Sequence, residues 1–404
     1  MKSVLLNEIC ELIVDCPHST AVNEGKGYPL VRTPNIGKGR LVYSGMHRVS
    51  EEVYHKRNLR AIPQEDDLIF AREATAGNVA LIQKGEKVCL GQRTVLIRPN
   101  KSIVNPAFLT YLLLAPKQQY NLLSTANGAT VAHVNLPTIR NLKLELPDSS
   151  IQHRIATILS RYDSLIENYQ KQIKLLEESA QRLYKEWFID LRFPGHENTK
   201  IVDGVPEGWE KKKLNEIFTF VRGKSYTSKE ISNDGVLMVN LKNIQAFGGY
   251  KRNAEKRFIG SYKQEQTLKK GDLIMGVTDM TQERRLVGHV ALIPDFKEPA
   301  TFSMDLIKIL SYEIPNSFLY CTMRFGGISS KISPLANGVN VLHLKPEAMM
   351  GLEMVTPSIN IINKFSKIVD GFFNNILILQ SQIRLLTEAR DRLLPKLMSG
   401  EIEV

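Results

Sequence analysis

Residues 170–188 read QKQIKLLEESAQRLYKEWF, and residues 380–398 read QSQIRLLTEARDRLLPKLM. The two stretches carry the same residue at many positions, and every matched pair is separated by 210 residues. The matched residues are Gln170, Gln172, Ile173, Leu175, Leu176, Glu178, Arg182 and Leu183, which recur as Gln380, Gln382, Ile383, Leu385, Leu386, Glu388, Arg392 and Leu393. The chain therefore contains one helical sequence twice.

The repeat also extends upstream of these two stretches. At the same offset, Ile151 matches Ile361, Pro147 matches Pro357, His133 matches His343 and Asn127-Gly128 matches Asn337-Gly338. Nearer the N-terminus the offset drifts, as it does when loops differ in length: Leu6–Ile9 matches Leu214–Ile217, Asp67–Ile69 matches Asp272–Ile274, and Gly77 matches Gly288. A period of about 200 residues indicates a duplicated domain rather than a solenoid. Each copy consists of a globular part followed by a long helix.

Each long helix has a clear beginning and a continuous apolar seam. In the first copy Asp148, Ser149 and Ser150 follow Pro147 and are candidate N-caps. Apolar residues then recur at three- and four-residue steps as far as Trp187. A run of ~38 residues at a rise of 1.5 Å per residue would span roughly 57 Å.

These seams must be covered. We expect the two helices to pair antiparallel with each other, which would give the molecule an approximate twofold axis. The alternative is that each helix packs on its own globular part or on another protein. The aromatic residues Tyr184, Trp187, Phe188 and Phe193 near the end of the first helix belong either to the core or to a docking patch for a partner.

The globular parts contain short strand-like runs separated by Gly, Pro and Asn. Examples are DDLIFARE (66–73) and NVALIQ (78–83) in the first copy, and GDLIMGV (271–277) and HVALIP (289–294) in the second. A helical run follows the strands in each copy, as in VNPAFLTYLLLAPKQQYNLL (104–123). The pattern predicts two mixed α/β globular parts of about 150 residues each.

Composition limits the class of protein further. The 404 residues include 53 Lys and Arg against 42 Asp and Glu, a net charge of +11, which favours a long polyanion as the partner. No apolar run reaches the ~18 residues that a membrane span needs, and the N-terminus lacks the features of a signal peptide. The four cysteines form no CxxC pair. We expect a cytoplasmic protein with reduced structural cysteines.

Several fragments resemble catalytic motifs without completing them. Gly223-Lys224-Ser225 resembles the end of a P-loop, but Phe218 stands where the first glycine would be required. Asn105–Phe108 resembles the tetrapeptide of amino-methyltransferases, but it lacks the second proline and a preceding Gly-rich cofactor loop. No carboxylate and lysine set follows Pro147-Asp148 or Pro294-Asp295 to form a metal-dependent nuclease core. We therefore predict no catalytic and no metal-binding residues.

With these residues in view, the chain resembles the specificity subunit of type I restriction–modification systems over essentially its full length. The resemblance rests on a junction, LYKEWFIDLRFPGHE (183–197) followed by DGVPEGWEKKKLNEIF (203–218), and on a C-terminal segment, RDRLLPKLMSGEIEV (390–404). The segment ANGATVAHVNLPTIRNLKLELP (126–147) resembles the end of a recognition domain in that family. One departure is that the helices do not open with the acidic-Gln pair often found there.

This resemblance implies an α+β fold with two similar mixed α/β target recognition domains, separated by two long antiparallel helices that form a coiled coil with pseudo-twofold symmetry. The implied domains are target recognition domain 1 (1–147), a central conserved helix (148–197), target recognition domain 2 (198–357) and a C-terminal conserved helix (358–404). The implied role is non-enzymatic: each recognition domain reads one half of an asymmetric bipartite DNA site. The helices set the spacer and dock the methyltransferase subunits.

The resemblance also implies the partners and the cofactors that they hold. Modification subunits would bring S-adenosylmethionine, and restriction/translocase subunits would bring ATP and Mg²⁺, so that no cofactor is expected in this chain. Two other classes of function stay open at this point. One is a single-chain DNA methyltransferase or nuclease with fused recognition domains, and the other is a coiled-coil scaffold without a DNA role.

Candidate DNA contacts are chosen by chemistry, because Lys and Arg neutralise phosphates while Arg, Asn and Gln can read base edges. The segment GGYKRNAEKRF (248–258), in which Tyr250 and Phe258 flank the basic residues, is the strongest candidate patch. The candidates are Arg32, Asn35, Lys38, Arg40, Arg72 and Arg93 in the first copy, and Arg222, Lys224, Lys242, Asn243, Lys251, Arg252, Arg284 and Arg285 in the second.

Overall fold

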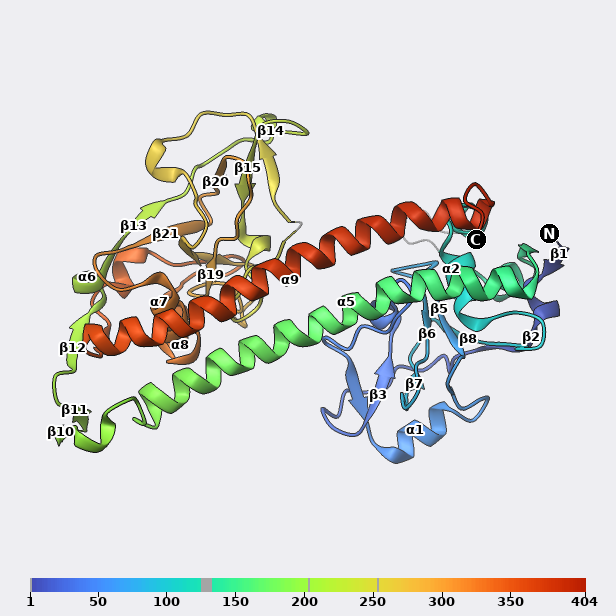
Figure 1. Cartoon of the computed structure of the whole chain (residues 1–404), viewed down its shortest axis with the longest axis horizontal. Helices are drawn as coiled ribbons and strands as arrows, with labels where there is room; N and C mark the ends of the chain where they lie inside the picture. The colour runs from blue at the N-terminus through green and yellow to red at the C-terminus, as the bar shows by residue number, and fades with distance from the viewer. Residues whose placement is uncertain (1, 125–132, 203, 253) are drawn as a thin grey trace. The chain divides into compact units, whose positions relative to one another are not determined.

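The computed structural model describes residues 2–124, 133–202, 204–252 and 254–404 of the chain. These residues form two compact units (Figure 1). Unit 1 contains residues 1–169 and 382–404, and unit 2 contains residues 170–381. Each unit therefore consists of one globular part, a portion of the first long helix and a portion of the second. The Asn127-Gly128 member of the sequence repeat lies outside the described residues.

The main sheet of unit 1 is antiparallel, with the strand order β2-β8-β5-β6. Its strands are β2 (Cys10–Asp15), β8 (Thr94–Pro99), β5 (Leu68–Ala71) and β6 (Val79–Leu81). A second sheet has the order β4-β3-β7, in which β3 and β7 are parallel. Its strands are β4 (His47–Val49), β3 (Tyr28–Val31) and β7 (Cys89–Leu90), and a separate antiparallel pair joins β1 (Lys2–Leu5) to β9 (Lys143–Leu146).

Unit 1 also contains short helices, some of which pack against one or the other of its two sheets. They are α1 (Glu51–Arg57), α2 (Pro106–Leu114), α3 (Pro116–Leu123) and α4 (Leu136–Arg140). Helix α2 begins where the sequence supplies both a cap and a proline: the Asn105 side chain accepts a hydrogen bond from the Phe108 amide at 3.0 Å, and Pro106 is the first helical residue. Asn105 therefore caps a helix, and the methyltransferase-like tetrapeptide has a structural role.

Unit 2 repeats this arrangement. Its main sheet has the order β13-β21-β17-β19, all antiparallel, with β13 (Phe218–Arg222), β21 (Leu306–Ser311), β17 (Leu273–Gly276) and β19 (Val290–Leu292). A second sheet has the order β14-β16-β15-β20, with β14 (Ile231–Ser232), β16 (Lys256–Phe258), β15 (Val236–Val239) and β20 (Ala300–Phe302). The strands β15 and β20 are parallel, as β3 and β7 are in unit 1.

The remaining elements of unit 2 are short. The antiparallel pair of β12 (Glu210–Lys213) and β23 (Glu353–Thr356) corresponds to β1 and β9 of unit 1. Two further pairs join β10 (Ile201–Val202) to β11 (Val205–Pro206) and β18 (Thr278–Asp279) to β22 (Leu342–His343). The helices are α6 (Leu214–Ile217), α7 (Asn316–Phe325) and α8 (Ile328–Ile332).

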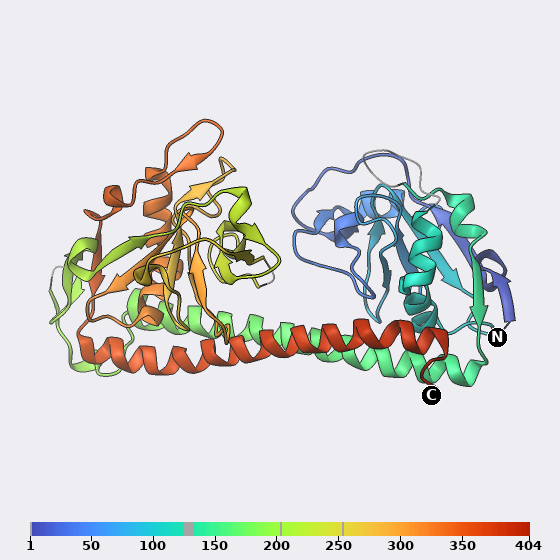
Figure 2. The same cartoon turned by 90° about the horizontal axis from the view of Figure 1, so that it is seen from above.

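The long helices are α5 (Ser149–Tyr184), which continues into a π-helical turn over Lys185–Ile189, and α9 (Ile359–Ser399). Within each unit the early part of one helix packs against the late part of the other, as Figure 2 shows. In unit 1, Leu397 is buried in the same apolar cluster as Ile155 and Leu159. In unit 2, the rings of Trp187 and Phe365 lie 5.8 Å apart. The predicted antiparallel pairing is thus confirmed inside each unit.

The aromatic residues at the end of α5 belong to the core of unit 2. Tyr184, Trp187 and Phe193 are buried, and Phe188 is partly buried with its ring 4.9 Å from the Phe365 ring. Burial raises the pKa of Tyr184 to about 12. This corrects the prediction of a partner-docking patch at these four residues, because the side chains that such a patch would need to expose are already packed inside the unit.

Candidate nucleic-acid interface

Asn35 and Asn243 are structural residues in equivalent positions of the two units. The Asn35 side chain accepts a hydrogen bond from the Arg32 amide at 3.2 Å and donates one to the Val42 carbonyl at 3.1 Å. Asn243 accepts from the Asn240 amide at 2.9 Å and donates to the Lys251 carbonyl at 2.9 Å. Both side chains are buried. They close a backbone turn in each unit, which corrects their assignment as base-reading residues.

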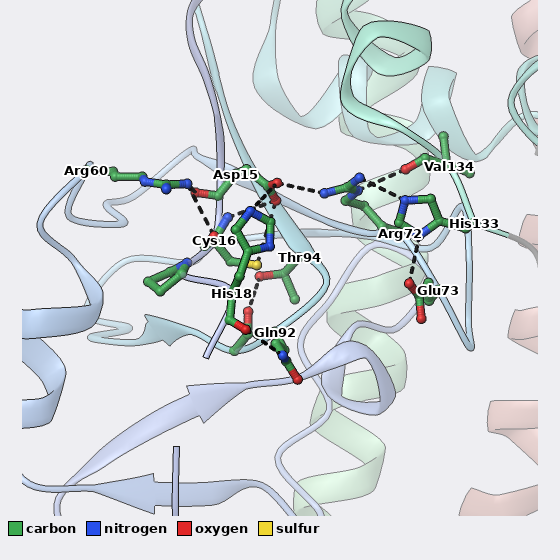
Figure 3. A network of polar contacts seen from close by, with 12 residues as sticks. Asp15, Cys16, His18, Arg60, Arg72, Glu73, Gln92, Thr94, His133 and Val134 are labelled. Carbon is green, nitrogen blue, oxygen red and sulfur yellow. Dashed lines mark hydrogen bonds and ion pairs between the residues drawn. The ribbon is translucent and has the colours of Figure 1, made fainter. Parts of the chain in front are cut away.

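The Arg72 side chain also forms its polar contacts inside the protein (Figure 3). Its guanidinium donates to the Val134 carbonyl at 2.9 Å and to an Asp15 carboxylate oxygen at 2.7 Å, and it lies 2.9 Å from Nε2 of His133. His133 in turn contacts Glu73 at 2.7 Å through Nδ1. Because each guanidinium nitrogen has an internal partner, Arg72 joins β2 to the segment that precedes α4, which corrects its assignment as a DNA contact.

Like Arg72, the candidates Arg40, Arg93 and Arg222 form ion pairs with carboxylates of their own unit. Arg40 pairs with Glu167 of α5 at 2.8 Å and is largely covered. Arg93 pairs with Glu73 at 2.6 Å, and Arg222 pairs with Glu347 at 2.6 Å, but more than half of each of these two side chains is exposed. Arg40 thus fastens a loop to the helix, whereas Arg93 and Arg222 can exchange a carboxylate for a phosphate.

The basic segment of residues 248–258 exposes only part of its side chains, and Asn253 lies outside the described residues. Tyr250 is buried, and burial together with the hydrogen bond that its hydroxyl donates to Glu255 raises its pKa. Phe258 is buried in the core as well. The two rings that flank the basic residues are therefore not available to stack on a base. Lys251 is exposed, and Arg252 is partly exposed.

The exposed lysines are the most accessible phosphate ligands. Lys38 of unit 1 and Lys242 and Lys251 of unit 2 are exposed, and none of the three forms an ion pair with the residues that the structure describes. Each lies in or beside a turn closed by Asn35 or Asn243. Lys224 is half-buried, with its backbone held by the Phe302 carbonyl at 2.8 Å. An unpaired ammonium beside a rigid turn suits a phosphate backbone.

The connection between β17 and β19 is a further exposed element. Only two of its residues, Arg284 and Arg285, are among the candidates predicted from the sequence. Its residue Asp279 is fully buried, and its carboxylate accepts hydrogen bonds from the amides of Thr281 at 2.8 Å and Leu286 at 2.6 Å. Burial alone would raise the pKa of Asp279, but these hydrogen bonds hold the pKa below its ordinary value. Met280, Gln282 and Glu283 project into solvent from this loop. The only signal in the sequence was the extra length of this loop in the second copy.

The described residues contain no group of three or more His, Cys, Asp or Glu side chains arranged to hold a metal ion. The thiols are also poor nucleophiles, because burial raises the pKa of Cys10 to about 12 and that of Cys89 to about 11. No helix in the described ranges is long and apolar enough to cross a membrane.

Comparison with known proteins now identifies the class. A family model described as "Type I restriction modification DNA specificity domain" matches residues 1–178 and 206–388, so the chain belongs to this family. It carries two specificity domains and is a non-catalytic DNA-recognition subunit of a type I restriction–modification system. The fused methyltransferase or nuclease is therefore not favoured, and a DNA specificity domain is not expected in a scaffold without a DNA role.

Individual relatives agree with this assignment. The type I restriction enzyme MjaIX specificity subunit of Methanocaldococcus jannaschii is 27% identical over 99% of this chain and 93% of its own length. The MjaVIII specificity subunit of the same organism is 24% identical over 86% of this chain and 81% of its own length. The crystal structure of the S subunit from M. genitalium has the same fold, with a TM-score of 0.60, 16% identity, and coverage of 98% of this chain and 95% of that one.

Proposed function

We propose that the globular part of each unit reads one half of a split, asymmetric DNA site. The observation that carries this proposal is the contrast between interior and surface. The buried turns closed by Asn35 and Asn243 have the same hydrogen-bond pattern in both units, whereas the exposed loops around them differ in sequence and length. Two equivalent scaffolds with different surfaces suit two different half-sites.

The long helices supply the second part of the proposed function. Because each runs through both compact units, a fixed helix length would set the number of base pairs between the half-sites. Leu175 on α5 and Leu385 on α9 are equivalent residues of the repeat, and both are more than half exposed. Exposed apolar side chains at equivalent positions suit two copies of one partner, the methyltransferase subunit.

The proposed partners also account for the chemistry that this chain lacks. Methyltransferase subunits would hold S-adenosylmethionine, and restriction/translocase subunits would hold ATP and Mg²⁺. This chain would bring both activities to a defined sequence in the cytoplasm. Its exposed lysines would hold the duplex through phosphates, and its polar loop residues would read base edges in the grooves.

Exchange of one recognition domain tests the proposed function. Residues 1–147 are replaced by the corresponding domain of a relative with a different target, and the methylated motif is read by methylome sequencing of cells that carry the complete system. We expect one half-site to change while the other half-site and the spacer stay the same. A change in both half-sites, or in neither, would overturn the modular reading. The matched control replaces the same residues with a recoded copy of themselves.

A further inference from the structure

The connection between β17 and β19 is built differently from its counterpart in unit 1. It covers residues 277–289, whereas the corresponding connection between β5 and β6 covers only residues 72–78. In unit 1 this short loop turns inward: Arg72 contacts Asp15, and Thr75 donates to the Thr33 carbonyl at 2.8 Å. In unit 2 the additional residues project from the surface.

The longer loop is held in one conformation from within. The buried Asp279 carboxylate bonds to both ends of it, through Thr281 and through the amides of Leu286 and Val287. Gln282 donates to the Val339 carbonyl at 2.9 Å, and the Phe247 amide donates to the Arg285 carbonyl at 2.8 Å. Three loops that are distant in sequence are thereby fastened together in unit 2.

The backbone of this cluster is strained where the loops meet. Arg284 has a φ of 52° and Phe247 has a φ of 63°, the left-handed region that bulky residues seldom adopt. Such conformations persist only where surrounding contacts enforce them, and they cluster at functional sites. The internal bonds of Asp279 supply that enforcement here.

The exposed side chains of the loop are better suited to contact base edges than phosphates. Glu283 is largely exposed and pairs with Nε of Arg285 at 2.8 Å. A carboxylate at this position repels the phosphate backbone, but it can accept a hydrogen bond from cytosine N4. Arginine can donate to two acceptors of guanine, and the Gln282 amide can form two hydrogen bonds with adenine once it exchanges its exposed bond to the Val339 carbonyl. Met280, with 78% of its surface exposed, adds an apolar contact.

We propose that the loop Met280–Arg285 is the specificity-determining element of the second recognition domain, with Gln282, Glu283 and Arg285 as base readers and Asp279 as the positioning residue. This inference rests on the proposed function, since it assumes that unit 2 reads a half-site. It assigns the discrimination of bases to one loop. The exposed lysines beside Asn243 then supply affinity without sequence preference.

The test compares two double variants with the same chemistry at different places in unit 2. Gln282→Ala/Glu283→Ala removes two proposed readers. Gln264→Ala/Glu265→Ala removes an exposed Gln-Glu pair from the short turn Gln264–Gln266 and serves as the control. Each variant is assembled with its methyltransferase subunits, and the methylated motif is read by methylome sequencing. We expect the loop variant to accept other bases at one or two positions of the second half-site, with the first half-site and the control motif unchanged.

The same experiment with Asp279→Asn tests positioning, since the amide cannot accept every hydrogen bond that the carboxylate accepts. We expect relaxed bases in the second half-site only, without a change in the salt dependence of DNA binding. If a variant methylates nothing, its sequence discrimination is measured instead by competition binding of the assembled complex to DNA. Discrimination between target DNA and DNA with a scrambled second half-site should fall by roughly tenfold or more.

Three results would overturn the inference: an unchanged motif, the same relaxation in the control, or undiminished discrimination in the competition assay. An unchanged motif together with a successful domain exchange would remove only the role of the loop. If the domain exchange altered neither half-site, the proposed function itself would fail. The two failures are therefore distinguishable.

Discussion

Asp163 of α5 and Arg390 of α9 are 227 residues apart in the chain and form an ion pair of 2.6 Å in the interior of unit 1. The Asp163 side chain is 2% exposed, and its other oxygen accepts a hydrogen bond from the Tyr111 hydroxyl at 2.6 Å. At the equivalent positions of unit 2 stand Phe373 and Ala180, where Phe373 packs edge-on against Tyr320 at 5.1 Å. The contact between α5 and α9 therefore contains a buried ion pair in unit 1 and apolar side chains at the equivalent positions in unit 2.

The polar junction predicts a large loss of stability when one partner is removed. Asp163→Ala removes the buried carboxylate from the Arg390 guanidinium and leaves it only the partly exposed Asp391, and breaking a buried pair costs about 3–5 kcal/mol of the free energy of unfolding. Denaturant unfolding of the purified chain would measure the loss. Arg392→Ala, at an exposed arginine of the same helix, is the control and should change the free energy by less than about 0.5 kcal/mol. Equal effects of the two variants would contradict a buried junction.

The two buried asparagines should behave as stabilising residues. Asn35→Ala and Asn243→Ala each leave a backbone donor and acceptor unpaired, at a cost of about 1–3 kcal/mol in the free energy of unfolding. The neighbouring exposed lysines provide matched controls. Lys38→Ala and Lys242→Ala should leave the unfolding transition in place and weaken DNA binding by the assembled complex. An asparagine variant with normal stability and a changed DNA motif would argue for base reading after all.

Salt dependence separates phosphate contacts from internal ion pairs. Lys242→Ala and Lys251→Ala should each reduce the slope of log Kobs against log salt concentration by about 0.9, because each lost phosphate contact releases one fewer counterion. Binding of labelled DNA to the assembled complex at several salt concentrations measures the slope. Lys211→Ala on β12, also an exposed lysine, should leave it unchanged. A uniform decrease across all three variants would indicate only a general charge effect.

The helices should behave as a spacer of adjustable length. Insertion of four residues after Tyr169 in α5 and four after Ser381 in α9 adds ~6 Å of helix, which corresponds to about two base pairs at 3.4 Å each. Methylome sequencing should then return the same half-sites with a longer gap. An unchanged gap in an active complex would refute the spacer role.

Partner docking should depend on the exposed leucines of the repeat. A glutamate at an apolar contact must lose water on binding, so Leu175→Glu and Leu385→Glu should each weaken the association with methyltransferase subunits. Size-exclusion chromatography or light scattering would count the bound subunits. The exposed Lys174→Glu variant places a negative charge beside Leu175 without removing an apolar side chain, and it should assemble normally. Full assembly by all three variants would place the docking surface elsewhere.

The duplicated organisation and the paired helices could be predicted, because the apolar periodicity of the helices and the repeat of the sequence are local patterns of residues. The ambiguity at Trp187 could also have been resolved from the sequence. Its repeat equivalent is Leu397, and both residues are buried. An aromatic residue that alternates with leucine at one position of a seam indicates a core position rather than a docking patch.

The candidate DNA contacts were harder to predict, because burial depends on partners that are distant in sequence. Nothing near Arg72 reveals that Asp15, 57 residues away, neutralises it. Asn35 and Asn243 have the side chain of a base reader, and only the turns that they close show another role. Asp279 is the opposite case. Its acidic side chain does not suggest a DNA contact, so the sequence gives no reason to select it.

Unit 1 is not complete until residues 382–404 have joined it, although its globular part is the first to be synthesised. The buried Leu397 covers the apolar face of α5 that Ile155 and Leu159 present. While the ribosome is producing unit 2, this cluster lacks Leu397, and Asp163 lacks its partner Arg390. The last buried contacts of the first recognition domain therefore form only after the whole chain has been synthesised, so translation speed and chaperone binding should affect the yield of active subunit.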